Sequence, residues 1–459
     1  MVGPTASPGG EPLLKRQIGL YAATAITVGS IIGSGIFRSP HSVAQELTSP
    51  VWALLAWVLG GVLSLCGSLA LAEMAVTHPR TGGLYVFIRE SFGDRLAFIF
   101  GWASLWVIKP TVIASIASVF ATYFCSAVGL PKGAEFLAGF SAIALLTFVN
   151  LLGVKQGTAT QTVLTTVKVV GILALCAAAF LLPHAGAPAG EALSEPNRGH
   201  PFLLAFAFAM IPIFFAYDGW TDSTYVGGEI VNPARNFPIA ILGGTLLVVA
   251  VYVVTNVAYF SVLSPAEVAT YQAVGAETMR RILGDWGGRA LAVLVAVSTF
   301  GTVNASVLTG PRVTLAMAAD GLFWRRAAHV NVKRGTPDVA LWIQGALATI
   351  WLWFAGGFED VSGWFVTTSW LFYGLTIAGI FIYRRKQRQG LVARPEYRTP
   401  LFPLTPLVFI LVTVAIVASD LSSSGWRAAA GVLVAALGLP FSYIWTRKGQ
   451  RSAASAPRV

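Results

Sequence analysis

The chain has 459 residues, of which 55% are hydrophobic and only 11% are charged, and its mean hydropathy is +0.70. These values exclude a soluble domain of ordinary composition and indicate a protein that crosses a membrane many times. The net charge of +11 does not require a nucleic-acid partner, because membrane proteins keep an excess of Lys and Arg in their cytoplasmic loops.

Apolar segments divide the chain into twelve expected transmembrane helices of about 20 residues or more. They are expected at residues 18–47, 51–77, 93–127, 135–153, 156–182, 202–232, 238–263, 287–319, 338–355, 361–383, 402–420 and 426–446. Under this assignment, basic residues on the N-terminal side outnumber those on the other side by about three to one. This bias predicts a multi-pass protein of the cell (inner) membrane with both termini in the cytoplasm.

The segments between and around the spans complete the expected organisation. Residues 1–16 lack the apolar core of a signal peptide and predict a disordered cytoplasmic tail. The other expected units are a first five-helix repeat at 17–182, an extracellular loop at 183–201, a second five-helix repeat at 202–383, a basic cytoplasmic loop at 384–401, two further helices at 402–446 and a cytoplasmic tail at 447–459. The three cysteines lie in or at the edge of apolar segments and predict neither a disulfide framework nor a metal site.

The first expected helix is interrupted by the sequence VGSIIGSGIF at residues 28–37. Glycine is a poor helix former, and three glycines fall here within seven residues. A break at membrane depth frees backbone groups, which is tolerated only where they line a protein cavity or contact a ligand. Small residues also allow helices to pack closely, so binding and packing are equally open from this segment alone.

The sixth expected helix carries a second interruption, with Asp218, Gly219 and Asp222 in mid-span. Each aspartate costs about 2.5–3.5 kcal/mol at the centre of a membrane helix, so this helix does not run unbroken through lipid. Interrupted helices at the start of two five-helix units predict the binding site of a transporter with inverted repeats. Free N–H groups at a half-helix favour a carboxylate and free carbonyls favour an ammonium, which predicts an α-amino acid as substrate. Neither a nucleophile–base pair nor a metal-ligand cluster accompanies the breaks, which argues against an enzyme.

Three motifs lie in these spans: GSIIGSGIF followed by Pro40, FAYDGW followed by GGEIVNPARNFP, and STFGTVNAS in the eighth expected helix. In this order they resemble the amino acid–polyamine–organocation superfamily, and within it the L-type amino acid transporter family and its bacterial members. The resemblance implies an all-α integral membrane protein with twelve transmembrane helices and the leucine transporter-type fold. That fold has five plus five inverted helices, discontinuous first and sixth helices, two added helices and no cofactor.

The resemblance also implies the residues of the substrate site. The positions that match carboxylate binding are Ile31, Gly33, Ser34 and Gly35. Those that match the segment receiving the amino group are Phe215, which also matches an aromatic gate, Ala216 and Asp218. Positions that match the lining of the pocket are Asn304 and Trp370. Asp218 replaces a glycine of some relatives, and its carboxylate can either bind the ammonium or cap the broken helix.

Lys168 lies roughly 18 Å along the fifth expected helix, which is too deep for its ammonium to reach the membrane surface. The resemblance matches it to a lysine that takes the place of a sodium ion in sodium-coupled relatives. Such an ammonium would be held by carbonyls of the first helix and by hydroxyls such as those of Ser298 and Thr299, which implies sodium independence. Whether Lys168 releases its proton during transport stays open, because burial can lower the pKa of a lysine by several units.

Two further basic residues fall inside expected spans. Lys109 precedes Pro110, which frees the carbonyl of Trp106, and a structural bond from Lys109 to that carbonyl is expected. Arg312 is expected toward the cytoplasmic half of the eighth helix, in a gating or structural pair.

The primary expectation is a sodium-independent exchanger or facilitator of neutral L-amino acids, because the matched pocket lacks a dedicated charge for a side chain. A proton-coupled symporter is the alternative, and Asp218 leaves a transporter of cationic amino acids or polyamines open. A receptor or scaffold is disfavoured, because two interrupted helices in inverted repeats supply alternating access. Animal relatives bind a glycoprotein through a cysteine in the loop after the third helix, and residues 126–134 contain none, so no covalent partner is expected. The expected partners are the amino acid and the lipid bilayer.

Overall fold

The computed structural model describes residues 14–183, 200–354, 358–423, 426–443 and 445. Residues 1–13 of the predicted N-terminal tail, nearly all of the predicted extracellular loop and the predicted tail at 447–459 lie outside the described residues. What is described consists of helices, turns and three isolated β-bridges.

The first part of the chain forms eight α-helices. They are α1 (Leu20–Ile31), α2 (Gly35–Glu46), α3 (Pro50–Thr77), α4 (Leu84–Phe92), α5 (Asp94–Ala103), α6 (Lys109–Val128), α7 (Glu135–Leu152) and α8 (Val154–Leu181). The second part contains α9 (Phe202–Tyr217), α10 (Asp222–Tyr225), α11 (Pro233–Pro238), α12 (Gly244–Val262), α13 (Pro265–Thr270), α14 (Val274–Thr309), α15 (Pro311–Ala319), α16 (Asp338–Phe354), α17 (Phe358–Arg388), α18 (Leu404–Ser423) and α19 (Trp426–Ala436). Two π-helical turns, Ser104–Ile108 and Ile239–Gly243, join α5 to α6 and α11 to α12.

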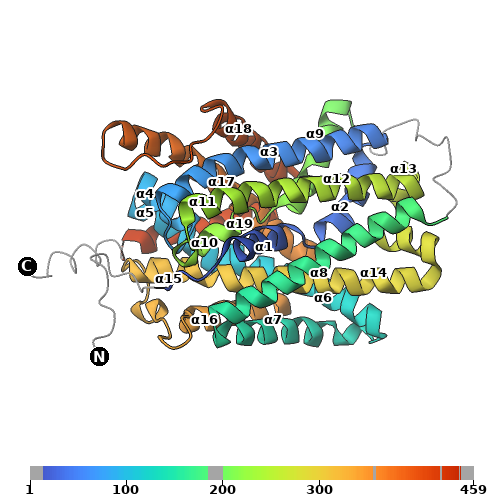
Figure 1. Cartoon of the computed structure of the whole chain (residues 1–459), viewed down its shortest axis with the longest axis horizontal. Coiled ribbons are helices and arrows are strands. Elements are labelled where there is room, and N and C mark those ends of the chain that lie inside the picture. Colours follow the sequence, from blue (N-terminus) through green and yellow to red (C-terminus); the bar gives the residue numbers. More distant parts are fainter. Residues whose placement is uncertain (1–13, 184–199, 355–357, 424–425, 444, 446–459) are drawn as a thin grey trace, which may run out of the picture.

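Within the described residues, nine helical stretches are long and apolar enough to cross a membrane, and three further apolar helices are shorter. The shorter ones are Phe202–Tyr217, Asp338–Phe354 and Ala429–Tyr443. The long helices run side by side along the longest axis, and α1 lies near the centre, between α12 and α8 (Figure 1). The chain is an all-helical, multi-pass membrane protein.

Both predicted interruptions are present. The first separates α1, which ends at Ile31, from α2, which begins at Gly35. In the second, α9 ends at Tyr217 because Asp218 is extended and Gly219 has a φ of +112°. The chain then continues as the short α10 and a 3-10 turn, Gly227–Glu229, and not as one helix to residue 232.

The expected start of the eighth span at residue 287 lies close to the kink of α14 at Gly284, after which the helix runs to Thr309. The sequence analysis missed the part of α14 that precedes this kink and begins at Val274. Its first turns are polar: Arg280 and Arg281 both donate to the carboxylate of Glu277. Apolar length cannot identify such a segment. The sequence analysis also missed α4 and α13, although α13 starts with a capping box in which Ser264 and Glu267 bond reciprocally.

The capping box of α13 makes a testable contribution at neutral pH. Burial opposes the ionisation of Glu267, but hydrogen bonds from Arg281 and Ser264 outweigh it and hold the pKa of this carboxyl below its ordinary value of 4.5. Stability from a lowered carboxyl pKa is present above the unfolded value and is lost as the pH falls through the folded value. We therefore expect Glu267→Gln to speed hydrogen exchange of residues 264–271 at about pH 7, and the difference from the wild type to be smaller at about pH 3. An equal difference at both pH values would contradict this account.

Candidate functional site

The two interruptions lie against each other. A Cβ built on Gly35 would stand 2.6 Å from the Cα of Ala216, so only glycine permits this approach. Gly219 approaches the backbone of Ser30 in the same way, with 2.7 Å from a built Cβ to the carbonyl carbon. The Tyr252 hydroxyl, on α12, lies 3.0 Å from both the Ile31 and the Ala216 carbonyl oxygens and can donate to either. The ends of α1 and α9 are thereby held together.

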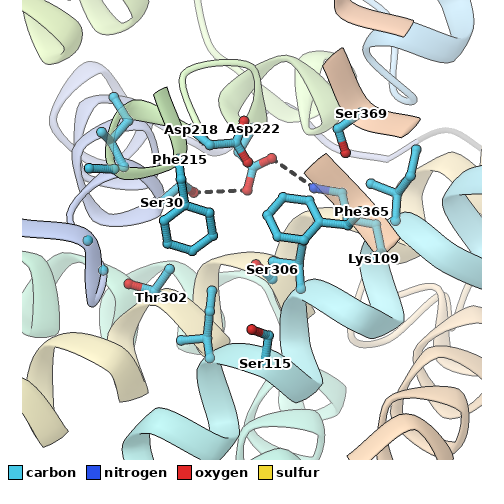
Figure 2. A pocket seen from close by; sticks show the side chains of 18 of the residues that line it. Ser30, Lys109, Ser115, Phe215, Asp218, Asp222, Thr302, Ser306, Phe365 and Ser369 are labelled. Carbon is cyan, nitrogen blue, oxygen red and sulfur yellow. Dashed lines mark hydrogen bonds and ion pairs between the residues drawn. The ribbon is translucent and has the colours of Figure 1, made fainter. Parts of the chain in front are cut away.

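A narrow cavity of about 50 Å³ lies at this junction. Seven of the predicted site residues line it: Ile31, Gly33, Ser34, Gly35, Phe215, Ala216 and Asp218. Figure 2 shows that Phe215, from α9, and Phe365, from α17, both point into it, and their ring centroids are 5.9 Å apart. Because the cavity is small, these rings must separate before a ligand larger than a few atoms can occupy it.

One wall of the cavity favours an anion. It includes Gly35, the first residue of α2, and the N-cap residue Ser34 makes no capping hydrogen bond with its side chain. The first N–H groups of a helix lack intrahelical acceptors, and the helix dipole adds a partial positive charge there. A carboxylate at this wall would satisfy both.

Lys168 lies behind the end of α1 and is fully buried. Its Nζ donates to the carbonyl oxygens of Gly29 and Ile32, at 3.0 and 2.7 Å, and to the Thr302 hydroxyl at 3.0 Å. The expected hydroxyl partners are corrected. Ser298 donates to the same carbonyl group of Ile32, and Thr299 bonds within its own helix. Thr302 was missed although it stands in the quoted motif, because the face of its helix was not known.

Another part of the cavity lining carries acidic groups, Asp218 and Asp222. The carboxylate of Asp218 accepts from the Gly219 N–H and from the Tyr373 hydroxyl. Its Oδ1 is buried and has no hydrogen-bond partner among the described residues. Both roles considered for Asp218 are therefore compatible with the geometry, because the carboxylate bonds the turn after α9 and still has an oxygen for a ligand cation.

Lys109 does not make the expected bond to the Trp106 carbonyl, which accepts instead from the Trp351 indole at 3.0 Å. The ammonium of Lys109 lies 2.8 Å from Oδ1 of Asp222 and 4.4 Å from the centre of the Tyr225 ring. Lys109 and Asp222 both line the cavity (Figure 2). The sequence analysis singled out both residues but did not pair them, because they are 113 positions apart.

Asn304 and Trp370 lie outside the cavity lining, which corrects the expectation for both. Thr302 and Ser306 on α14 line the cavity, and Asn304 lies two residues from each, about 200° around the helix. It bonds to Asn150, Gln161 and the Gly157 carbonyl instead. On α17 the lining face consists of Phe365, Ser369 and Tyr373. Trp370 is rotated about 100° from it and packs against Phe214 and Phe409.

Arg312 forms a buried ion pair whose partner, Glu229, was not predicted. Its Nε and one Nη lie 2.9 and 3.1 Å from the two carboxylate oxygens of Glu229. Neither side chain is more than 1% exposed. The pair joins α15 to the turn after α10.

The contact of Gly219 with Ser30 gives a sharp prediction. Gly219→Ala is expected to reduce uptake more than tenfold and to lower the melting temperature, because a Cβ there meets backbone and the positive φ disfavours alanine by about 1–3 kcal/mol. Gly93→Ala is the matched control, since Gly93 has a φ of +89° but no described atom lies within 4 Å of a built Cβ. The Gly93 variant therefore measures the cost of the positive φ without a steric clash. Equal effects of both substitutions on uptake would show that the close approach is unimportant.

Comparison with known proteins adds to this geometry. The family model described as amino acid permease matches residues 18–437. The serine/threonine exchanger SteT of Bacillus subtilis is 32% identical over 94% of this chain and 97% of its own. The b(0,+)-type amino acid transporter 1 of Rattus norvegicus is 34% identical over 94% of this chain and 88% of its own. The large neutral amino acids transporter small subunit 2 of Homo sapiens is 35% identical over 88% of this chain and 76% of its own.

Proposed function

The chain belongs to the amino acid permease family and is an amino acid transporter, and we propose that it is a sodium-independent exchanger of neutral L-amino acids that works by alternating access. The family match confirms the superfamily resemblance of the motifs. We further propose the leucine transporter-type arrangement: twelve spans, two inverted five-helix repeats at 17–182 and 202–383, and both termini in the cytoplasm of a cell (inner) membrane. The arrangement is supported by the matching interruptions after α1 and α9.

The observation that carries sodium independence is the position of the Lys168 ammonium. It occupies a point where two backbone carbonyls and a hydroxyl converge at the end of α1, within 3.0 Å of each. Carbonyl and hydroxyl oxygens at the break of a transporter helix are suitable ligands for sodium. A fixed positive charge among them leaves no room and no charge balance for a second cation.

Exchange and a neutral substrate rest on different observations. One relative is named a serine/threonine exchanger and another a transporter of large neutral amino acids. The cavity itself offers an anion-favouring wall at Gly35, the aromatic rings of Phe215 and Phe365, and hydroxyls such as Ser306. These groups suit a zwitterion with a small or apolar side chain.

A cationic substrate is the second candidate, and Asp218 favours it. Lys109 forms its ion pair with Asp222 and attracts Asp218 as well, but Oδ1 of Asp218 has no hydrogen-bond donor among the described residues and the side chain lines the cavity. A buried carboxylate of this kind is stabilised by a positive charge. That charge can be the α-ammonium of any amino acid, or a second one on its side chain.

Counterflow in proteoliposomes tests the proposal. With sodium-free buffer on both sides, labelled serine or leucine should enter only vesicles loaded with unlabelled amino acid. Uptake that requires sodium would contradict the proposal, and accumulation in empty vesicles under an imposed pH gradient would favour proton-coupled symport instead. A competition panel of twenty amino acids against the labelled substrate then separates the neutral from the cationic candidate.

A further inference from the structure

The carboxylate of Asp222 is the meeting point of four helices on the cavity wall. Its Oδ1 accepts from Lys109 on α6 at 2.8 Å. Its Oδ2 accepts from Ser30 on α1 at 3.0 Å and from Thr309 on α14 at 3.3 Å. Figure 2 shows Asp222 between Ser30 and Lys109. The side chain is buried, so these three donors replace its hydration.

The three donors belong to two bodies. Ser30 is assigned to the same body as Asp222, because the segment directly before α1 is joined to the turn after α10 by backbone bonds from Gln17 and Ile18 to the Glu229 carbonyl, at 2.8 and 2.9 Å. Lys109 begins α6 directly after the π-helical turn at Ser104–Ile108, and Thr309 ends α14. Both lie inside helical stretches that continue past the cavity, Asp94–Val128 and Val274–Ala319, and α6 packs against α14. The Ser30 bond is therefore internal to one body, whereas the other two bonds cross the boundary.

A second connection crosses the same boundary further from the cavity. The buried pair of Arg312 with Glu229 joins α15 to the interrupted segment. Beyond it lies a separate cavity of about 440 Å³, whose lining includes Gly228, Leu315 and Asp320. Gly228 is adjacent to Glu229, and Leu315 is three residues from Arg312. The bonds of Asp222 and the pair of Arg312 therefore stand in sequence between the two cavities.

We propose that Lys109, Asp222 and Thr309 form a latch that closes the substrate cavity toward the cytoplasm and opens when substrate leaves on that side. The inference rests on the proposed alternating access, in which one group of helices rocks against the other around a fixed site. During that motion the bonds from Lys109 and Thr309 to Asp222 break, while the bond from Ser30 persists. Lys109 lines the cavity, so the latch lies within reach of the substrate itself.

The test uses the double variant Lys109→Gln with Asp222→Asn in proteoliposomes of known orientation. Removing both charges together avoids leaving one buried charge unpaired. Weakening the latch favours the state open to the cytoplasm, and apparent affinity follows the population of the competent state. If that population rises from about a tenth to about a half, the cytoplasmic KM falls about fivefold and the external KM rises about twofold.

Two hydroxyl variants supply matched controls, since each removes one donor to the same Oδ2. Thr309→Val removes a bond across the boundary. Like the double variant, it should lower the cytoplasmic KM and raise the external KM, here by about twofold. Ser30→Ala removes the internal bond and should leave their ratio unchanged. If the ratio of cytoplasmic to external KM is the same in Thr309→Val, in the double variant and in the wild type, the latch is overturned.

A readout without transport separates this inference from the proposed function. Ser306 lines the cavity, and Ser306→Cys in a chain with Cys66, Cys125 and Cys176 replaced by serine reports access from one side. The double variant should speed its labelling by an impermeant thiol reagent on the cytoplasmic side about fivefold. If the double variant is labelled faster but the wild-type protein shows no counterflow, the proposed exchange is refuted and the latch stands. Counterflow with an unchanged labelling rate, or both KM values raised by one factor, would refute the latch.

Discussion

Lys168→Ala is expected to reduce amino acid uptake by about a hundredfold or more while the protein still reaches the membrane. The ammonium holds the carbonyls of Gly29 and Ile32, and Thr302 can donate to only one of them at a time. The other hydroxyl nearby, Ser298, lies 3.4 Å from the Ile32 carbonyl oxygen and closer, at 3.2 Å, to that of Gly33. Each buried carbonyl left without a donor costs about 1–3 kcal/mol, and bonds to a charged group are at the upper end of the range for hydrogen bonds. The cost falls on the turn at residues 32–34, which leads to the anion-favouring wall at Gly35, so this turn loses its shape. Initial uptake rates in sodium-free proteoliposomes, normalised to protein content, measure the effect.

Two variants show whether charge or packing is responsible. Lys168→Met keeps most of the volume beside Gly301, where the lysine fits tightly, and removes the charge. We expect it to be as inactive as the alanine variant. Lys155→Ala is the matched control, because Lys155 lies on the same helix and is exposed. Full activity of Lys168→Met would mean that the side chain only fills space, and a sodium requirement in the wild type would contradict the role of the ammonium.

The interruptions of the two helices could be predicted because their cause is local. Glycines at 33 and 35 and an aspartate–glycine pair at 218–219 disfavour a membrane helix whatever surrounds them. The depth of Lys168 was likewise predictable from its position along an apolar segment. Local composition thus located the backbone of the site and the nearby buried cation.

Side-chain partners could not be predicted in the same way, because they depend on the rotation of each helix and on distant parts of the chain. The resemblance selected Asn304 from its motif, but two residues on a helix separate opposite faces, and its neighbours Thr302 and Ser306 line the cavity instead. The pairs of Lys109 with Asp222 and of Arg312 with Glu229 join segments 113 and 83 residues apart. An intramembrane charge indicates that a partner exists, but it does not identify which one.

Asp218→Asn is expected to raise the KM for neutral amino acids about 10- to 150-fold. The substitution keeps the shape of the side chain and its bond to the turn, but it replaces a charged acceptor by a neutral one. A hydrogen bond to a charged group contributes about 1.5–3 kcal/mol, which converts to that range of affinity. Every α-amino acid carries the ammonium that the free Oδ1 would accept. Saturation curves for a labelled neutral substrate give the change, and Asp285→Asn, at an exposed position directly after the kink of α14, is the control.

The pattern across substrates tells which cation Asp218 binds. If the carboxylate contacts the α-ammonium, neutral and cationic amino acids should lose affinity by the same factor in the Asn variant. If it contacts a charged side chain, inhibition by lysine and arginine should weaken at least tenfold more than inhibition by leucine or serine, about 1.4 kcal/mol of difference. No change for any substrate would mean that both carboxylate oxygens serve only the turn between Tyr217 and Gly219. The ammonium would then rest on backbone carbonyls alone, among them the one at Ile31 that Tyr252 now approaches.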